Sequence, residues 1–356
     1  MAIDIREHIP LSTHTTIGLG GNARYFTTCE RVEQIREALD FCAKENVLLQ
    51  VIGAGSNLIF SDYGFNGLVM KLALRGVTTE DDGEATEITA HAGENWDEFV
   101  KYCINIDCAG IECLSGIPGL VGATPIQNVG AYGQEVSDTI VNLTALDRTS
   151  GEAVEFSNTD CRFEYRQSRF KSSDLNRYLI VKVTFRLRKN GKPEIRYAEL
   201  RNHISSQVDL NALDGGRHSL DAVRNAVLAL RKRKSMVLDP ADPNTKSVGS
   251  FFMNPVLATE QFNALKSLWT QAGHTNTIPT FSAKGGTKVP AAWLVENAGY
   301  RKGFRKGGSG ISSNHALALV NHGGTTAELL ALANEIQEAV RKRFGIQLER
   351  EPVVIP

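Results

Sequence analysis

Residues 115–133 read Ser115-Gly116-Ile117-Pro118-Gly119-Leu120-Val121-Gly122-Ala123-Thr124-Pro125-Ile126-Gln127-Asn128-Val129-Gly130-Ala131-Tyr132-Gly133. Small residues alternate here with proline, glutamine and asparagine, so the stretch has too little side chain to form a core of its own. A structureless segment of this length is uncommon in a compact domain and is usually functional. The pattern therefore favours a planar ligand packed against main chain, with Gln127 and Asn128 for its polar edges. An ordinary irregular loop is the alternative interpretation.

A shorter glycine-rich stretch precedes it, Gly53-Ala54-Gly55-Ser56-Asn57-Leu58. It begins like a dinucleotide-binding fingerprint, but Leu58 stands where the third glycine is expected and the residues after it do not open a helix. A Rossmann site is therefore not predicted. The stretch predicts a strand that runs into a turn with consecutive exposed N–H groups, which suits a pyrophosphate.

Hydrophobic spacing predicts a mixed chain in which strands and helices alternate. Early strands are expected at 47–52, 67–72 and 87–90, with helices at 31–44 and 95–106, and later antiparallel strands at 141–146, 153–156 and 179–187. Further helices are expected at 221–234 and at 259–273, the second with Thr259 as its N-cap. Thr325 and Glu328 form a capping box that opens a helix to Phe344, which Gly345 ends.

Composition excludes several classes of protein. The chain has 356 residues, enough for two or three domains, and 39 basic against 40 acidic residues give a net charge of −1. No global field attracts nucleic acid or an anionic membrane. The start lacks the pattern of a secretory signal, and no apolar stretch approaches the ~20 residues of a membrane span. A protein of the reducing cytoplasm, without nucleic-acid or membrane partners, is therefore expected.

The six cysteines predict no metal site, because no CxxC or CxxH spacing accompanies them. They are interpreted as small buried thiols. Short basic clusters at 231–234 and 301–306 have no adjoining aromatic or zinc pattern of the RNA-binding kind. A solvated helix end or attraction of a diphosphate explains them as well.

Several motifs in order carry a family resemblance. They are His14-Thr15-Thr16-Ile17-Gly18, the two glycine-rich stretches, Cys161-Arg162-Phe163-Glu164-Tyr165-Arg166-Gln167-Ser168-Arg169-Phe170, Gly249-Ser250-Phe251-Phe252-Met253-Asn254-Pro255 and Leu348-Glu349-Arg350-Glu351. Together they resemble the UDP-N-acetylenolpyruvoylglucosamine reductase family over nearly the whole chain.

The resemblance implies an α+β fold. It consists of an FAD-binding domain of the vanillyl-alcohol-oxidase (PCMH) type, made of two α+β subdomains, followed by a smaller α+β substrate-binding domain. The expected division is 1–75 for the first FAD subdomain, with 346–356 as a candidate addition, then 76–234 for the second and 235–345 for the substrate domain. The proline-rich link at 239–243 marks the boundary before the last domain.

The implied activity is reduction of the enolpyruvyl group of UDP-N-acetylglucosamine enolpyruvate to the lactyl ether of UDP-N-acetylmuramate, a peptidoglycan precursor. Non-covalent FAD is the implied cofactor, NADPH the co-substrate and a monomer the expected state. Two alternatives remain open at this point. One is an FAD-dependent oxidase of an alcohol or sugar with the same fold, and the other is a non-catalytic nucleotide-sugar or RNA-binding protein.

The resemblance also implies roles for individual residues. Arg166 matches the family's catalytic arginine, and its planar fork suits a carboxylate. Ser250 matches the proton donor, and Glu351 matches a glutamate that stabilises the enolic intermediate. Without the resemblance, these residues would be interpreted as a surface arginine, a turn serine and an exposed glutamate. Glu349 lies close enough to leave open which glutamate acts.

The expected binding residues fall into two groups. The cofactor group is Gly53, Ala54, Gly55, Ser56, Asn57, Leu58, Ile117, Pro118, Gly119, Gly122, Ala123, Pro125, Gln127, Asn128, Gly130, Ala131, Tyr132 and Gly133. The substrate group is Tyr165, Tyr197, Lys234 and Asn254. The chain departs from the family at Met253, where lysine is usual, so one charge near the nucleotide is absent.

Overall fold

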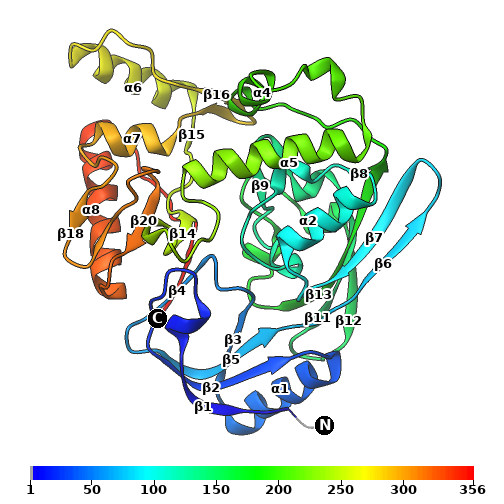
Figure 1. Ribbon diagram of the computed structural model, residues 1–356. Helices are drawn as coiled ribbons and strands as arrows, with labels where there is room; N and C mark the ends of the chain where they lie inside the picture. Colours follow the sequence, from blue (N-terminus) through cyan, green and yellow to red (C-terminus); the bar gives the residue numbers. More distant parts are fainter. Residues whose placement is uncertain (1–2) are drawn as a thin grey trace. The chain divides into compact units, whose positions relative to one another are not determined.

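The computed structural model describes residues 3–356, and the chain separates into two compact units. Unit 1 contains the segment up to Ile9, Ala23–Gly55 and Phe65–Val237, and unit 2 contains Pro10–Asn22, Ser56–Gly64 and Leu238–Pro356. Each unit mixes helices and strands (Figure 1). The division into three domains at 75, 234 and 345 stays a prediction.

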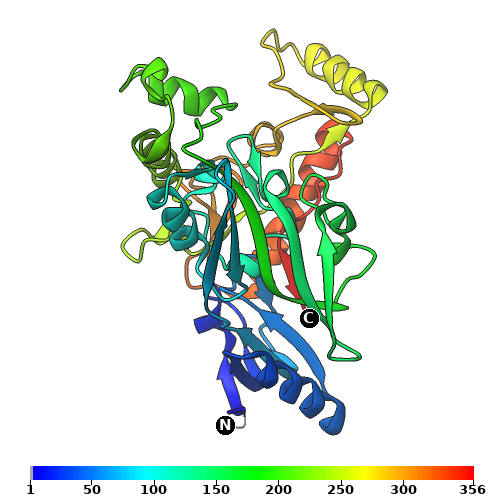
Figure 2. The same ribbon diagram turned by 90° about the vertical axis from the view of Figure 1, so that its right-hand side faces the viewer.

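A small sheet with parallel pairings lies at the start of unit 1. Its strand order is β1 (Arg6–Pro10), β2 (Asn22–Cys29), β5 (Phe65–Leu72) and β3 (Leu48–Ile52). Strands β2 and β3 both run parallel to β5, and the helix α1 (Val32–Glu45) connects them along the sheet (Figure 2). The predicted strand–helix–strand arrangement of this region is confirmed.

Unit 1 continues with a larger antiparallel sheet. Its order is β12 (Ala153–Ser157), β11 (Ile140–Asp147), β13 (Tyr178–Lys189), β7 (Ala85–His91) and β6 (Val77–Asp81), and β8 (Cys108–Ala109) pairs with the end of β13. The helix α2 (Trp96–Asn105) packs on it through aromatic contacts. Trp96 and Phe99 lie 5.9 and 5.1 Å, between ring centroids, from Phe185 of β13. All three rings are buried, so this contact forms a centre of the core.

The helix α5 (Gly216–Arg233) begins five residues before the predicted 221–234. The prediction was wrong at this end because a distant residue caps the helix. The Asp107 carboxylate accepts a hydrogen bond of 2.6 Å from the backbone N–H of Arg217, which satisfies one of the first-turn donors. No local sequence signal reports a cap from a residue 110 positions away. Unit 1 also contains the helices α3 (Asn158–Cys161) and α4 (Ala198–Ser205).

Unit 2 is built around a four-stranded sheet and a long helix. The sheet order is β14 (Ser247–Ser250), β20 (Ala318–Asn321), β19 (Ser309–Ile311) and β18 (Arg305–Lys306). A second sheet contains β15 (Val256–Leu257), β17 (Gly286–Lys288) and β16 (Phe281–Ala283), and the helices are α6 (Thr259–Gln271), α7 (Ala291–Asn297) and α8 (Thr326–Phe344). Strand β21 (Val353–Ile355) runs parallel to β4 (Leu58–Phe60).

Helix α6 starts at Thr259, which is therefore the first helical residue and not the N-cap that the sequence predicted. Ala258 occupies the N-cap position, with extended backbone at φ −60° and ψ 160°. Its backbone N–H donates to the side chain of Gln261 at 3.0 Å. The bond from the Ala258 N–H to Gln261 is one of the two hydrogen bonds of a capping box. The other bond is absent because alanine has no side-chain oxygen to accept it.

The ends of α8 follow the prediction. Thr325 accepts from the backbone N–H of Glu328, whose carboxylate accepts from the N–H of Thr325, and Gly345 ends the helix at φ 69°. Asp62, two residues after the end of β4, provides a second cap for α8. Its two carboxylate oxygens accept from the N–H groups of Thr326 at 2.7 Å and Ala327 at 2.9 Å. A negative group at this position also favours the helix dipole.

We expect Asp62→Ala to lower the free energy of unfolding by about 1–2 kcal/mol, because two helix N–H donors lose their carboxylate partner. Thermal or urea unfolding followed by circular dichroism measures this change. Glu296→Ala removes an exposed carboxylate from α7 and is the matched control. Equal stabilities of the Asp62 and Glu296 variants would contradict the capping role.

The six cysteines are buried and unpaired to one another, as the sequence predicts. Burial raises the pKa of Cys29 and of Cys161 to about 12, so these thiols stay protonated at neutral pH. In the part of the chain that the structure describes, no helix combines the length and apolar character needed to cross a membrane.

Candidate active site

The start of the shorter glycine-rich stretch, Gly53–Gly55, lies in unit 1 with the longer stretch. Strand β3 ends at Ile52, and a Cβ on the following Gly53 would stand 3.4 Å from the side chain of Leu120. Gly55 adopts φ 65°, a left-handed conformation that glycine enters without steric cost. Gly53 is thus near Leu120 of the longer stretch, and the expectation that both stretches line one site stays a prediction.

The longer stretch is fixed near its start by a charged pair. Arg224 of α5 donates to both oxygens of Asp97 at 2.6 and 2.8 Å, and Asp97 accepts from the N–H of Gly116 at 2.6 Å. Burial acts to raise the pKa of Asp97, but the bonds from Arg224 and Gly116 lower it overall, so the carboxylate is held ionised. The chain thus enters the stretch from a rigid anchor.

Close backbone packing continues along this stretch. The N–H of Gly122 donates to the carbonyl of Ala92 at 3.0 Å, and a Cβ on Gly122 would stand 2.4 Å from that of Ala92. Only glycine permits this approach. At Gly122 the backbone of the stretch therefore packs directly on the backbone of Ala92, so the stretch is not an irregular surface loop.

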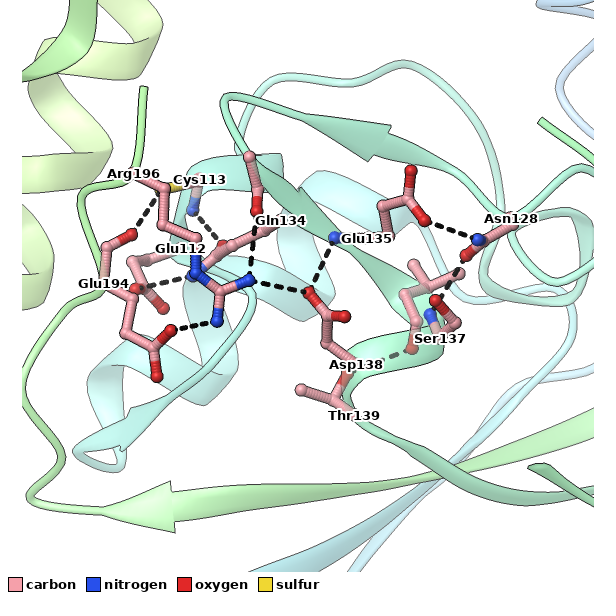
Figure 3. Close-up of polar contacts among 12 residues, drawn as sticks. Glu112, Cys113, Asn128, Gln134, Glu135, Ser137, Asp138, Thr139, Glu194 and Arg196 are labelled. Atoms are coloured by element: carbon pink, nitrogen blue, oxygen red, sulfur yellow. Dashed lines mark hydrogen bonds and ion pairs between the residues drawn. The ribbon is translucent and has the colours of Figure 1, made fainter. Parts of the chain in front are cut away.

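The stretch ends in a tight hairpin. Strands β9 (Gly130–Ala131) and β10 (Gln134–Glu135) are joined by Tyr132 and Gly133, at φ 49° and 86°. Positive φ at both central residues is typical of a type I′ turn, which normally selects asparagine and glycine. The buried side chain of Gln134 secures it, because it bonds to Glu112 at 2.9 Å and accepts from the N–H of Cys113 at 2.8 Å (Figure 3).

Tyr132 is the centre of a mixed aromatic and charged group. Its ring meets that of Tyr197 edge-on with centroids 5.7 Å apart, and Lys234 Nζ lies 6.0 Å from its centroid. Lys234 also donates to Glu199 at 2.7 Å. Burial raises the pKa of Tyr132 to about 12 and raises that of Tyr197, so both phenols remain hydrogen-bond donors at neutral pH. The structure thus brings together three of the predicted binding residues.

Arg166 occupies a strained turn in unit 1. The backbones of Glu164 and Gln167 exchange hydrogen bonds of 3.0 and 3.1 Å around Tyr165 and Arg166. Arg166 has φ 55° at the second central position, which in a type II turn calls for glycine or asparagine. Strain of this kind is concentrated at functional sites. The guanidinium donates to the carbonyl of Gly130 at 2.6 Å, so it lies against β9.

The structure corrects the expectation for the Asn128 side chain as a polar edge for a ligand. Asn128 is buried, and its amide donates to Glu135 at 2.7 Å and to the carbonyl of Glu164 at 3.1 Å. Its Oδ1 accepts from the N–H of Ser137 at 3.1 Å (Figure 3). The side chain is thus engaged within the protein.

Ser250 lies at a bulge in unit 2. Ser247 pairs with Val320 and Ser250 with Ala318, so β14 uses one more residue than β20 between the two pairs. Gly249 takes φ 76° inside the irregularity. A bulge re-aims the side chains that follow it and is common beside active sites. The bulge therefore explains why glycine, which adopts positive φ without steric cost, precedes Ser250.

Glu351 is paired through its backbone with Phe251, the residue that follows Ser250. Its N–H donates to the carbonyl of Phe251 at 3.0 Å, and the amide of Asn57 donates to its carbonyl at 3.4 Å. Glu349 is exposed and pairs farther along, where its carbonyl accepts from Met253. Along the backbone, Glu351 thus pairs one residue from Ser250 and Glu349 pairs three residues from it, and the choice between the two carboxylates stays a prediction. The structure describes Arg166 in the other unit.

Asn254 has a structural contact of its own. Its Oδ1 accepts from the N–H of Ala291 at 2.8 Å and so caps the first turn of α7. Met253 lies beside Asn254, half-buried, in the position where the family usually has lysine.

Two buried polar atoms near the glycine-rich stretch have no hydrogen-bond partner among residues 3–356, Arg231 Nε and Gln167 Oε1. Arg231 Nε would lie 3.5 Å from a Cβ on Gly116. Because buried polar atoms in proteins are nearly always paired, these two atoms indicate a polar ligand. Arg231 Nε, next to the buried Gly116, is a charged donor of the kind that suits the diphosphate of a dinucleotide. The residues present therefore fit FAD.

Sequence reasoning missed several residues of this region. Four residues were not predicted because their contacts are with residues far along the chain or across a hairpin. They are Arg231, Asp97, Gln134 and Glu135. The one local signal was the Tyr132-Gly133 pair, since a residue followed by glycine between short extended segments indicates a two-residue turn. The other contacts leave no pattern in the sequence.

Fold and site together define a flavin-dinucleotide-binding protein. A family model described as "FAD binding domain" matches residues 23–157, which contain both glycine-rich stretches. A second model, the C-terminal domain of UDP-N-acetylenolpyruvoylglucosamine reductase, matches residues 240–355.

Full-length relatives narrow the class to one family. The UDP-N-acetylenolpyruvoylglucosamine reductase of Thermobifida fusca is 43% identical over 100% of this chain and 99% of its own. Those of Streptomyces coelicolor and Mycobacterium tuberculosis strain H37Rv are 44% and 43% identical, over 97% and 99% of this chain and 89% and 95% of their own. The chain belongs to the UDP-N-acetylenolpyruvoylglucosamine reductase family.

A solved structure confirms the predicted fold class. The crystal structure of the reductase from Thermus caldophilus superimposes with a TM-score of 0.67 at 22% identity and covers 100% of both chains. An α+β FAD-binding domain followed by a reductase C-terminal domain is therefore the architecture of this chain.

Proposed function

We propose that this protein reduces the enolpyruvyl group of UDP-N-acetylglucosamine enolpyruvate with NADPH, and so forms the lactyl ether of UDP-N-acetylmuramate. The observation that carries this proposal is the 43% identity to the Thermobifida fusca reductase over the whole chain. When bound, FAD supplies the centre that takes a hydride from NADPH and returns it to the enolpyruvyl double bond. The other tasks fall to side chains of the protein.

Arg166 binds the substrate carboxylate in this proposal. Addition of hydride to the methylene carbon leaves negative charge on the neighbouring carbon, which the attached carboxylate delocalises. A guanidinium placed against that carboxylate stabilises the developing charge. The bonds from Arg166 to the carbonyls of Gly130 and Asn128 set its orientation before substrate arrives, which supports this role.

Ser250 donates the proton that completes the reduction. Its hydroxyl proton passes to the carbon next to the carboxylate, and the resulting alkoxide is reprotonated from water. The bulge at Gly249 supports a specially directed side chain here. Glu351, whose backbone pairs with Phe251, stabilises the enolic form of the substrate by a hydrogen bond in this proposal.

The group around Tyr132 binds the nucleotide part of the substrate. Lys234 supplies positive charge, and Tyr197 supplies a phenol that donates hydrogen bonds to phosphate oxygens. Tyr165 and Asn254 are proposed to contact the rest of the substrate. The absence of lysine at Met253 leaves more of the phosphate attraction to Lys234.

The two alternatives are not favoured. The full-length relatives described above are reductases and not oxidases of alcohols or sugars. A non-catalytic binding protein does not account for the matches to an FAD-binding model and to a reductase C-terminal model. We further propose a monomer that acts in the cytoplasm, where NADPH and charged nucleotide sugars are held. Sedimentation of the purified protein and fractionation of cells test these two points.

The visible spectrum of the purified protein tests the proposal. We expect a flavin spectrum whose absorbance is released into the supernatant by acid, since the FAD is not covalently bound. Anaerobic NADPH should bleach it, and the enolpyruvyl nucleotide sugar should then restore it with formation of UDP-N-acetylmuramate. A colourless protein unchanged by FAD, or a bleached protein that only oxygen restores, would contradict the proposal.

A further inference from the structure

Asn128 connects the turn of Arg166 to the glycine-rich stretch at two points. Its side-chain amide donates to the carbonyl of Glu164, which opens the turn, at 3.1 Å. Its own carbonyl accepts from Arg166 Nη1 at 3.4 Å. One buried residue therefore holds both the backbone that leads to Arg166 and the guanidinium at the end of the side chain.

Glu135 determines how the Asn128 amide is oriented. A carboxylate only accepts hydrogen bonds, so the bond of 2.7 Å between Glu135 and Asn128 requires the amino group of Asn128 to face it. The Oδ1 atom is then directed to the N–H of Ser137, at 3.1 Å (Figure 3). A flipped amide would place Oδ1 against two acceptors, Glu135 and the carbonyl of Glu164. The orientation is thus fixed by charge.

Glu135 also touches the second support of Arg166. It pairs with Gly130 across the β9–β10 hairpin, and Gly130 accepts from Arg166 Nη2 at 2.6 Å. A Cβ on Gly130 would stand 2.8 Å from Glu135 Cγ and 3.1 Å from Arg166 Nη1. The carboxylate stem, the glycine and the guanidinium are therefore packed with no room for a side chain between them.

We propose that Asn128 and Glu135 are positioning residues for Arg166. Glu135 holds the Asn128 amide in one orientation, and Asn128 holds the strained turn and the guanidinium in the geometry that receives the substrate carboxylate. The inference rests on the proposed function, in which Arg166 binds that carboxylate. It adds that the geometry of Arg166 depends on a carboxylate that itself touches no substrate.

The consequence is a selective effect on one half of the reaction. Arg166 acts on the enolpyruvyl substrate, so loss of its orientation slows reoxidation of the flavin by that substrate. Reduction of the flavin by NADPH does not use the substrate carboxylate and keeps its rate. A general loss of structure would slow both halves and release flavin.

Stopped-flow absorbance on Glu135→Ala measures the two halves separately. We expect flavin reduction by NADPH within about twofold of wild type, and reoxidation by the nucleotide sugar slowed roughly 10- to 100-fold, as displacements near 1 Å cause. Calorimetry on the oxidised protein should show weaker substrate binding. Glu135→Gln keeps an accepting oxygen and should restore most of the rate. Glu155→Ala, an exposed strand glutamate of the same unit, is the matched control.

A double-mutant cycle separates positioning from stability. In an Arg166→Ala background, Glu135→Ala should cause no further loss of the reoxidation rate. An additive loss in that background, or equal slowing of both halves, would overturn the proposal. Should Glu135→Ala lose its flavin, Glu135→Asp, which shortens the side chain by one methylene, takes its place with the same expected split.

The outcomes also distinguish this inference from the proposed function. If Arg166→Ala reoxidises like wild type, or wild type is not reoxidised by the nucleotide sugar, the proposed function fails. If Arg166→Ala is slow and Glu135→Ala is not, the proposed function stands and the positioning role is wrong.

Discussion

Ser250→Ala is expected to keep its rate of flavin reduction by NADPH and to reduce the enolpyruvyl substrate roughly 10²- to 10⁴-fold more slowly than wild type, the usual size of a lost proton donor. Hydride addition without protonation leaves an unstable anion that returns the hydride. Ser250 follows the bulge at Gly249, which gives its hydroxyl a fixed position. A water molecule has no such fixed position and therefore replaces the hydroxyl poorly as a proton donor.

Single-turnover stopped-flow with prereduced protein measures this effect. Ser267→Ala removes an exposed hydroxyl from α6 of the same unit and should behave like wild type. Ser250→Cys provides a replacement proton on a larger thiol that forms weaker hydrogen bonds, and it should recover part of the rate. A Ser250→Ala protein that turns over at the wild-type rate would show that the proton comes from elsewhere.

Arg166→Lys is expected to lower the rate of substrate reduction by about 10²- to 10³-fold, the effect of losing a preorganised donor to developing negative charge. Lysine keeps the charge but not the planar fork, so it cannot bond to the two carbonyls and to a carboxylate in one fixed geometry.

Arg162→Lys is the matched control for this change. Arg162 is exposed, lies four residues earlier and has φ 50°, close to the 55° of Arg166. Its replacement should leave both half-reactions unchanged. Comparable losses in the Arg162 and Arg166 variants would indicate that the segment as a whole matters and not the guanidinium of Arg166.

Elements that depend on nearby residues were predictable from the sequence. The capping box of Thr325 and Glu328 and the αL glycine at position 345 use side chains within one turn of the helix end, and the structure has both. The end of the long strand β13 alternates buried and exposed residues from Phe185 to Arg188, whereas residues 179–181 and 183–185 are buried throughout. The glycine stretches were found because a lack of side chains is itself visible in a sequence.

Features that depend on distant residues were not predictable. The cap of α5 comes from Asp107, and the second cap of α8 comes from Asp62, 264 positions before the helix. The engagement of Asn128 by Glu135 turned an expected ligand contact into an internal one. Residue roles at the site came from the family motifs, because an arginine in a basic segment and a serine before two phenylalanines have common structural explanations.

The pairing of β21 with β4 has a consequence for how the molecule is made. Asn57 and Glu351 are joined across 294 positions of chain, and β4 pairs with β21 directly beside this bond. At ribosomal rates of about 5–20 residues per second, roughly 15 to 60 seconds separate the emergence of the two. During that time β4 is a half-finished edge, open to wrong partners in a crowded cell. The yield of newly synthesised protein should therefore depend strongly on chaperones or on a low growth temperature. The stability of the folded enzyme should depend on them much less.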